Sequence, residues 1–332
     1  MSTGTGRDVF VMRAIQVREF GGPEVLVPEE IPDPVAGPGQ VVVGLAAADV
    51  IYLDTLLRAG WGGEYFPVKP PYVPGGGGAG GCCPWGGVDP GWIGRHVVAW
   101  GSGGYAEQMA AAVEEIVEVP DGVSSLDAAA VLHDGTTAVM LTHKAKIAQD
   151  EWVLVAAATG GAGSLLVQLA RTAGARVVAA ARGERKLALA RELGAEVAID
   201  YSQQGWQHQV REAVGGSGVD LAFDGAGGEL GKAAFEAVAP GGRFITYGTS
   251  SGAFADIDPK AAEQRQVQVT NALESGPPDR TTMRDALTQA LTLTAQDRIH
   301  PVIGATYPLE RASDAHTSLA QRATLGKSLL LT

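Results

Sequence analysis

The sequence predicts two domains, a mostly β domain and an α/β domain with a doubly wound parallel sheet. Three observations lead to this fold class. The chain has 332 residues, which is too long for one small core. Short strand-like runs cut by Pro and Gly fill residues 12–120, as in an all-β unit. Strands and helices alternate between residues 152 and 248, which is typical of βαβ units.

The first domain is predicted to begin near Met12, after a flexible extension of residues 1–11. Breakers such as "PDPVAGPGQ" separate its strand-like runs. The clearest runs lie at 13–17, 40–48, 95–100 and 114–120. A helical segment follows, with Ser124 or Ser125 as its N-cap and Asp127 in its first turn.

The second domain is predicted from a regular series of strands and helices. Several of the strands are almost wholly apolar, as expected for parallel strands covered on both faces. The strands are expected at 152–157, 176–181, 196–200, 219–224 and 243–248, and the helices at 163–173, 184–193, 206–214 and 229–238.

The tail is predicted to hold a strand at 267–273, a helix at 281–296 and a last strand at 326–331, and to return to the first domain. We therefore expect a β domain of residues 12–125 with 274–332, and an α/β domain of residues 126–273.

Composition excludes several classes of function. The formal net charge is −12 and no basic stripe is visible, which argues against nucleic-acid binding. No apolar run reaches the ~18 residues of a membrane span, and the start lacks the layout of a signal peptide. Two adjacent cysteines, Cys82 and Cys83, cannot form a disulfide framework, which favours a reducing, cytoplasmic environment.

The Gly-rich turn in "VLVAAATGGAGSLLVQLA" predicts a dinucleotide-binding site. A strand runs into Gly160, Gly161, Ala162 and Gly163, and a helix begins at once. Glycine lets the backbone approach a pyrophosphate, and the helix N-terminus offers free N–H groups and a partial positive charge. Ala158 stands where the usual fingerprint has its first glycine, so the prediction depends on the surrounding strand–helix alternation.

The end of the second strand of this domain indicates which dinucleotide is bound. An acidic residue there would bind the ribose hydroxyls of NAD. The chain has "AAARGERK" instead, with Arg182 at the acid's position and Lys186 one helical turn later. Basic residues are unfavourable at a helix N-terminus, so a solvated helix start explains them less well than a 2′-phosphate does. The sequence therefore favours NADPH over NADH.

Five segments resemble the zinc-free medium-chain dehydrogenases/reductases of the quinone oxidoreductase group. They are "AAATGGAGSLLVQLA", "RKLALARELGAEVAIDY", "VDLAFDGAGG", "PGGRFITYG" and "YPLERASDAHTSLAQRATLGKSLLL". The resemblance covers nearly everything from Met12 to the end. It implies a GroES-like β domain plus a Rossmann domain, with the active site in the cleft between them. It also implies a homodimer and hydride transfer from NADPH to a quinone or another α,β-unsaturated carbonyl compound.

The resemblance also implies roles for single residues, and it assigns the pyrophosphate turn to Gly160–Gly163. The further residues are Thr137 near the nicotinamide, Lys186 and Tyr201 at the adenosine 2′-phosphate, Tyr247 and Gly248 beside the cofactor, and Lys327 near the cleft. The chain departs from the family at two places. Ile51 stands where the family often has an asparagine associated with the nicotinamide and substrate region, and His133 with Asp134 precede the Thr137 turn.

The segment "PGGGGAGGCCPWGGVDPGW" (residues 74–92) has the most glycines but predicts neither a phosphate site nor a metal site. Zinc-dependent relatives place a His-Glu pair where this chain has Gly76 and Gly77. Zinc needs three or four N, S or O ligands, and no His lies at ligand spacing from Cys82 and Cys83. We therefore expect no metal, two small packed thiols, and glycines that allow close backbone packing and tight turns.

Without a metal, charge on the reduced acceptor must be met by a proton donor or by solvent. Tyr52 and His133 are the candidate catalytic donors; each could instead have a packing or structural role. Asp134 could orient His133 or cap a helix, and Asp54 is expected to fix a loop or a helix start. Protonation by solvent, with no dedicated acid, is the third possibility.

Three functions remain open at this stage. The first is an NADPH-dependent reductase of quinones or enones, and the second is a narrower enoyl or polyketide-tailoring reductase. The third is a non-catalytic NADPH-binding sensor or stress protein, which the altered position at Ile51 keeps open.

Overall fold

The computed structural model describes residues 10–62, 66–84, 90–272, 276 and 278–332. The chain divides into two compact units. Unit 1 consists of Met1–Leu132, Ile303–Thr324 and Ser328–Thr332, and unit 2 of His133–Val302 with Leu325–Lys327. Most of the predicted flexible extension, residues 1–9, lies outside the described residues, whereas its last residue, Val11, begins a strand.

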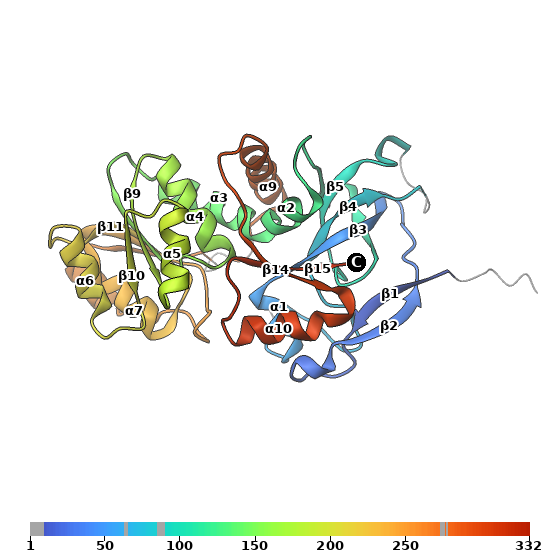
Figure 1. The fold of residues 1–332 in the computed structure, drawn as a ribbon, viewed down its shortest axis with the longest axis horizontal. Coiled ribbons are helices and arrows are strands. Elements are labelled where there is room, and N and C mark those ends of the chain that lie inside the picture. Colours follow the sequence, from blue (N-terminus) through green and yellow to red (C-terminus); the bar gives the residue numbers. More distant parts are fainter. Residues whose placement is uncertain (1–9, 63–65, 85–89, 273–275, 277) are drawn as a thin grey trace, which may run out of the picture. The chain divides into compact units, whose positions relative to one another are not determined.

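Unit 2 contains the predicted doubly wound sheet (Figure 1). Its six strands run in the order β10-β9-β8-β11-β12-β13, and the pairings between them are parallel. This is the 3-2-1-4-5-6 order of dinucleotide-binding folds. The strands are β8 (Trp152–Ala156), β9 (Arg176–Ala181), β10 (Val197–Asp200), β11 (Val219–Asp224), β12 (Val238–Thr246) and β13 (Gln268–Asn271). The predicted strand 267–273 is therefore shorter, and residue 273 lies outside the described part.

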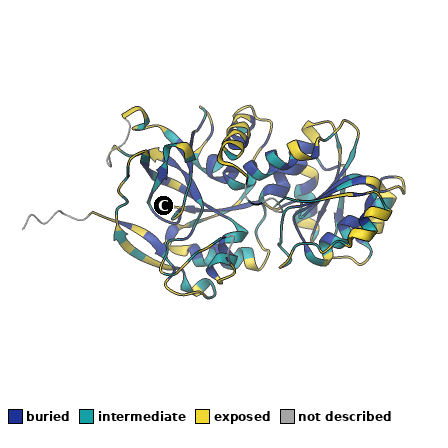
Figure 2. Ribbon diagram, turned by 180° about the vertical axis from the view of Figure 1, so that it is seen from behind, coloured by how far each residue is buried: buried dark blue, intermediate teal, exposed yellow. Residues whose placement is uncertain are grey.

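Helices cover both faces of this sheet. Side chains of α6 (Trp206–Ala213), α7 (Gly228–Glu236) and α8 (Pro259–Gln264) form one buried cluster with sheet residues such as Leu154 and Val178. Right-handed crossovers place α4 (Gly161–Thr172) and α5 (Glu184–Glu192) on the other face. Figure 2 shows these strands as buried and the outer sides of several helices as exposed. Among the described residues, no helix is long and apolar enough to cross a membrane.

The predicted helical segment after residue 124 is two helices, not one. α2 (Ser125–Val131) has Ser124 as its N-cap. The Ser124 hydroxyl accepts a hydrogen bond from the Asp127 backbone N–H at 3.1 Å, so the predicted N-cap is confirmed. α3 (His133–Ala145) follows after Leu132, and the division between the two units falls at this break.

The division of the chain differs from the predicted boundaries at both ends of the α/β unit. Unit 2 begins at His133, and it includes α9 (Arg280–Ala295), which the prediction assigned to the first domain. α9 packs along α3 with its buried residues, among them Leu287 and Leu291. Its helical pattern was visible in the sequence, but its packing partner was not.

Unit 1 is built on a sheet in the order β14-β15-β3-β4-β5-β7, with β6 paired to β3. The pairings of β3 with β15, β4 and β6, and of β5 with β4 and β7, are antiparallel. β1 and β2 form a separate antiparallel pair, and helices α1 (Tyr52–Arg58) and α10 (Ala312–Ala320) complete the unit. The strands are β1 (Val11–Gln16), β2 (Val27–Pro32), β3 (Gln40–Val50), β4 (Gly77–Cys82), β5 (His96–Trp100), β6 (Gln108–Ala112), β7 (Ile116–Glu118), β14 (Ile303–Pro308) and β15 (Lys327–Leu331).

The prediction of tight turns in the glycine-rich segment is wrong for residues 77–82, which form the interior strand β4. The expected close backbone packing is confirmed. A Cβ on Gly80 would lie 1.9 Å from the Gly44 carbonyl oxygen, and one on Gly78 would lie 2.4 Å from that of Ala47. Larger residues would therefore push β3 and β4 apart. Residues 85–89 of the segment lie outside the described part.

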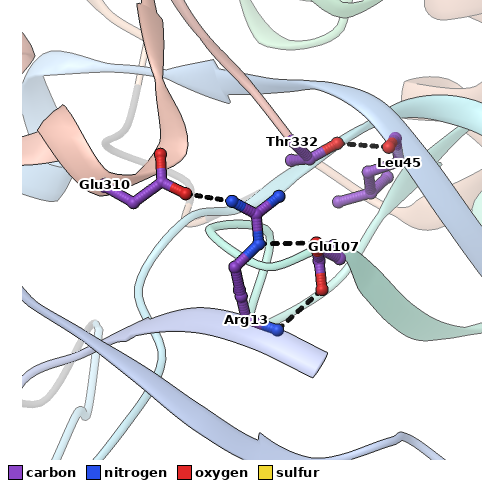
Figure 3. Close-up of polar contacts among 5 residues, drawn as sticks. All are labelled: Arg13, Leu45, Glu107, Glu310 and Thr332. Atoms are coloured by element: carbon purple, nitrogen blue, oxygen red, sulfur yellow. Dashed lines mark hydrogen bonds and ion pairs between the residues drawn. The ribbon is translucent and has the colours of Figure 1, made fainter. Parts of the chain in front are cut away.

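The C-terminal segment returns to unit 1, as predicted. β15 pairs antiparallel with β3, and Thr332 Oγ1 donates a hydrogen bond to the Leu45 carbonyl oxygen (Figure 3). Arg13 of β1 donates from Nε to Glu107 at 2.7 Å and from Nη1 to Glu310, and so connects three segments far apart in the sequence. The Arg13 side chain is half exposed, so these ion pairs orient the segments more than they stabilise them.

Candidate functional site

The candidate site lies at the carboxyl edge of the six-stranded sheet, where the strand order reverses. β8 and β11 are neighbours there although two strand–helix units separate them in the chain. The register aligns Ala156 of β8 with Asp224 of β11, and Asp224 with Thr246 of β12, so the three strands end together. In open α/β sheets, ligands bind outside the carboxyl ends of the strands at this switch point.

The turn after β8 is shaped for an anion. Gly160 is the exposed N-cap of α4, its backbone is extended, and it caps the helix with no side chain. A Cβ on Gly160 would meet only the Ala157 carbonyl oxygen, at 3.4 Å, so its outer side is open. A Cβ on Gly163 would lie 2.3 Å from the same oxygen, so helix and strand can pack this closely only with glycine. These residues fit the pyrophosphate of a dinucleotide.

An ion pair lies beside this turn. Nζ of Lys327 is 2.9 Å from Oδ2 of Asp134, and the exposed fractions of the two side chains are 4% and 21%. Asp134 is the second residue of α3, and a Cβ on Gly161 would lie 1.8 Å from its Oδ2. Asp134 therefore contacts the first turn of α4, and it contacts Lys327 as well. The sequence suggested only that Asp134 orients His133 or caps a helix.

The end of the candidate site that is predicted to bind adenosine lies after β9. Arg182 is exposed and Lys186 is half-buried in the first turn of α5. Tyr201 follows the neighbouring strand β10, where its backbone N–H donates to the Ala181 carbonyl oxygen at 3.1 Å. Its ring packs edge-on against Trp206, with 6.2 Å between the ring centroids.

One acidic residue at this end was missed by the sequence analysis. Asp200, the last residue of β10, accepts hydrogen bonds from the backbone N–H groups of Gly183 and Ser202, at 3.1 and 2.9 Å. Burial raises the pKa of Asp200, but the hydrogen bond from the Ser202 hydroxyl, the two backbone hydrogen bonds and the charge of Arg182 together lower it. The carboxylate therefore fixes the turn that carries Arg182. The parallel pairing of β9 and β10 would have been needed to find it.

The turns after β11 and β12 are also organised by a buried carboxylate. Asp224 accepts from the backbone N–H groups of Ala226 and Gly227, at 3.0 and 2.9 Å, and from Thr246 Oγ1 at 3.0 Å. Burial raises the pKa of Asp224, although these three hydrogen bonds act in the opposite direction. The backbone N–H of Tyr247 donates to the Asp224 carbonyl oxygen at 2.9 Å.

Tyr247 and Gly248 are thereby held against the turn after β11. A Cβ on Gly225 would lie 2.5 Å from the Tyr247 phenol oxygen, and one on Gly248 would lie 2.5 Å from the Gly225 carbonyl oxygen. Burial and the charges of Asp224 and Asp134 raise the pKa of Tyr247, so its phenol keeps its proton. Tyr247 can donate a hydrogen bond from this position.

The two candidate proton donors lie in different units. Tyr52 is the half-buried first residue of α1 in unit 1, and His133 is the half-buried first residue of α3 in unit 2. Thr137 lies one turn further along α3. Asp54 fixes a helix start as predicted, because its Oδ2 accepts from the Ile51 backbone N–H at 3.0 Å.

The described residues contain no group of three or more His, Cys, Asp or Glu side chains placed to hold a metal ion. Cys82 is buried and Cys83 half-buried, and both are free thiols. Burial raises the pKa of Cys82 to about 11 and raises that of Cys83 as well. Both thiols therefore stay protonated near neutral pH, whereas a metal ligand must be a thiolate.

Comparison with known proteins agrees with this geometry. Residues 161–292 match a family model described as zinc-binding dehydrogenase. A 2-haloacrylate reductase from Burkholderia sp. is 31% identical over 97% of this chain and 99% of its own length. A quinone oxidoreductase from Pseudomonas aeruginosa is 30% identical over 96% of this chain and 99% of its own length.

A solved structure also covers nearly the whole chain. The quinone oxidoreductase of Escherichia coli, complexed with NADPH, superposes with a TM-score of 0.88 at 28% identity, and covers 96% of this chain and 100% of its own. The fold, the switch-point turn and these full-length similarities agree. The chain belongs to the quinone oxidoreductase family of medium-chain dehydrogenases/reductases.

Proposed function

We propose that the protein is an NADPH-dependent reductase of a quinone or another α,β-unsaturated carbonyl compound. The observation that carries this proposal is the open Gly160–Gly163 turn at the switch point of the sheet, with Arg182 and Lys186 at the end of the neighbouring strand. The similarity along the full length to quinone oxidoreductases and to a 2-haloacrylate reductase supports the acceptor class.

The residues of the turn and of the segment after β9 would hold the two phosphate-bearing parts of the cofactor. Gly160–Gly163 would receive the pyrophosphate through backbone N–H groups, and Arg182 with Lys186 would pair with the 2′-phosphate. Tyr201 would line the adenosine end. Thr137, Tyr247, Gly248 and Lys327 would lie along the rest of the cofactor.

NADPH, when bound, supplies the hydride, and the protein supplies position and orientation. The reduced acceptor then carries an enolate-like negative charge that needs a proton. Tyr52 and His133 are the side chains proposed to deliver it, with solvent as the alternative. Replacing each separately, as Tyr52→Phe and His133→Gln, distinguishes these sources. Loss of a dedicated donor should lower kcat about 100-fold, whereas kcat should stay unchanged if solvent supplies the proton.

The test of the proposed function is NADPH oxidation, followed by absorbance, against a panel of quinones and α,β-unsaturated carbonyl compounds, with NADH as the control. We expect turnover with at least one acceptor and a lower KM for NADPH than for NADH. A preference for quinones or for enoyl compounds would separate the broad reductase from an enoyl or polyketide-tailoring reductase. NADPH binding with no turnover on any acceptor would instead support a non-catalytic sensor.

We also infer that the protein is a cytoplasmic homodimer. β13 is an edge strand of the described six-stranded sheet, its open side has no partner strand among the described residues, and Val269 on it is 38% exposed. An open edge of this kind can pair with a second copy about a two-fold axis. The two free thiols, Cys82 and Cys83, support a reducing compartment. Light scattering of the purified protein tests the dimer, and a monomeric mass would contradict it.

A further inference from the structure

The ion pair of Asp134 and Lys327 lies beside the Gly160–Gly163 turn. The proposed function gives Asp134 no role there. The first turn of α4 offers a partial positive charge, which favours one anion. The Asp134 carboxylate is already in contact with Gly161 of that turn. A cofactor pyrophosphate needs the same helix N-terminus, so a carboxylate there repels it unless a cation cancels its charge.

Lys327 is positioned to be that cation. Its side chain is 4% exposed, and its Nζ lies 2.9 Å from Asp134 Oδ2. Because this side chain is buried, its ammonium interacts more strongly with neighbouring charges than it would in water.

The backbone fixes Lys327 in this place. Gly326 forms a parallel bridge with Gly160 and donates its N–H to the Thr159 carbonyl oxygen at 2.7 Å. The Lys327 N–H donates to the Val302 carbonyl oxygen at 2.7 Å. Gly326 has a φ of +61°, and a Cβ there would lie 2.0 Å from the same Val302 oxygen, so only glycine lets the chain deliver Lys327 beside the turn.

We propose that Lys327 neutralises Asp134 at the phosphate turn, and that this pair sets the affinity of the protein for the pyrophosphate of its cofactor. The proposal deepens the proposed function and rests on it. Asp134 is a positioning residue that holds the ammonium over the turn. Lys327 is the charge that makes the turn acceptable to a second anion. The two residues therefore act on cofactor affinity in opposite directions.

The test measures NADPH binding by calorimetric titration of the full-length protein and four variants. Lys327→Met removes the cation and leaves the carboxylate, so we expect the Kd for NADPH to rise at least about 30-fold. Asp134→Asn removes the competing carboxylate and leaves the cation, so we expect the Kd to fall ~5-fold. The double variant lacks both charges, and its Kd should lie between those of the two single variants. Asp297→Asn is the matched control, because it removes one carboxylate that is 90% exposed, and its Kd should equal that of wild type.

Adenosine 2′-monophosphate separates a local effect from a folding defect. It carries the 2′-phosphate but no pyrophosphate, so all variants should bind it as wild type does. If Lys327→Met also fails to bind adenosine 2′-monophosphate, that variant is misfolded. The NADPH affinity of Asp134→Asn is then compared with that of the double variant to test the effect of Lys327. Equal NADPH affinity in that pair, or Asp134→Asn weakening NADPH binding, would overturn the proposal.

The proposed function fails in a different way. If wild type binds NADPH but turns over no acceptor, the reductase assignment falls and the ion-pair proposal is still decided by the Kd values. If wild type does not bind NADPH at all, both fall together.

Discussion

The molecule contains two glycine-rich segments that use glycine for different reasons. In β4, the glycines are mostly buried inside an antiparallel sheet, and Gly78 and Gly80 let strand β3 approach. In the turn before α4, Gly160 is exposed and opens onto a helix N-terminus. The first segment has more glycines, but the second stands at a helix N-terminus, where the first backbone N–H groups have no partner within the helix. Glycine content alone therefore does not identify a phosphate site; the element that follows does.

The largest effect is expected from a side chain in β4. Gly80→Val places a Cβ 1.9 Å from the Gly44 carbonyl oxygen, and should lower the apparent free energy of unfolding by about 3 kcal/mol. Urea unfolding followed by circular dichroism measures it. Gly81→Ala in the same strand is the control, because a Cβ there meets nothing within 4 Å. Equal destabilisation by the two variants would contradict the packing explanation.

The second effect concerns the end of unit 2 that is proposed to bind adenosine. Replacing Arg182 and Lys186 together by Ala should raise the KM for NADPH about 30-fold and leave the KM for NADH nearly unchanged, because only NADPH carries a 2′-phosphate. Arg185→Ala, in the same turn of α5 and exposed, is the matched control. If both cofactors were affected equally, these residues would not bind the 2′-phosphate.

The third effect is a pH dependence of stability that arises beside the glycine-rich segment of unit 1. Gly75 packs against Tyr105, whose phenol donates to Asp54 Oδ2 at 2.9 Å and lies 2.9 Å from His316 Nε2. Because the phenol proton is committed to Asp54, His316 Nε2 carries a proton and donates to Tyr105. Burial and the charge of Arg58 lower the pKa of His316 to about 3, so the folded protein keeps this histidine neutral.

The unfolded chain takes up that proton below its ordinary pKa, whereas the folded chain does so only near pH 3. Stability is therefore lost as the pH falls through this window, by about 1.5 kcal/mol between pH 6.5 and pH 5. His316→Gln, which keeps a donor, should remove most of this dependence in urea titrations. A variant with the same pH dependence as wild type would show that other groups cause it.

The smallest change in stability is expected at the exposed turn. A Cβ on Gly160 meets only one atom, at 3.4 Å, so Gly160→Ala should change the apparent free energy of unfolding by less than about 0.5 kcal/mol. The same methyl group lies where the pyrophosphate is proposed to approach, so the Kd for NADPH should rise ~10-fold. Loss of stability without loss of binding would make Gly160 resemble the glycines of β4.

Much of the α/β unit could be predicted from the sequence because each strand and helix has its own local pattern. The strand at 152–157 and the turn at 160–163 are examples, and both lie within a few residues of the observed elements. β4 could not be recognised, because six residues of Gly, Ala and Cys have no strand pattern and are held in place by β3 and β5. The packing of α9 on α3 and the capping of the Arg182 turn by Asp200 depend on contacts distant in sequence.

The candidate site shows the same limit. The glycines and cations could be predicted from their spacing, but the pairing of Asp134 with Lys327 joins residues that are far apart in the sequence. No local pattern reports it, and only the return of the C-terminal segment to the turn at Gly160 brings the two charges together.

Hydrogen–deuterium exchange with and without NADPH compares the two glycine-rich segments as phosphate sites in one experiment. The backbone N–H groups of residues 160–164, and those of the turn at 182–186, should become protected when NADPH binds. Those of residues 77–82 are already held in the sheet and should not change. Protection confined to residues 77–82, or none at 160–164 with NADPH bound, would show that the turn before α4 does not bind the cofactor.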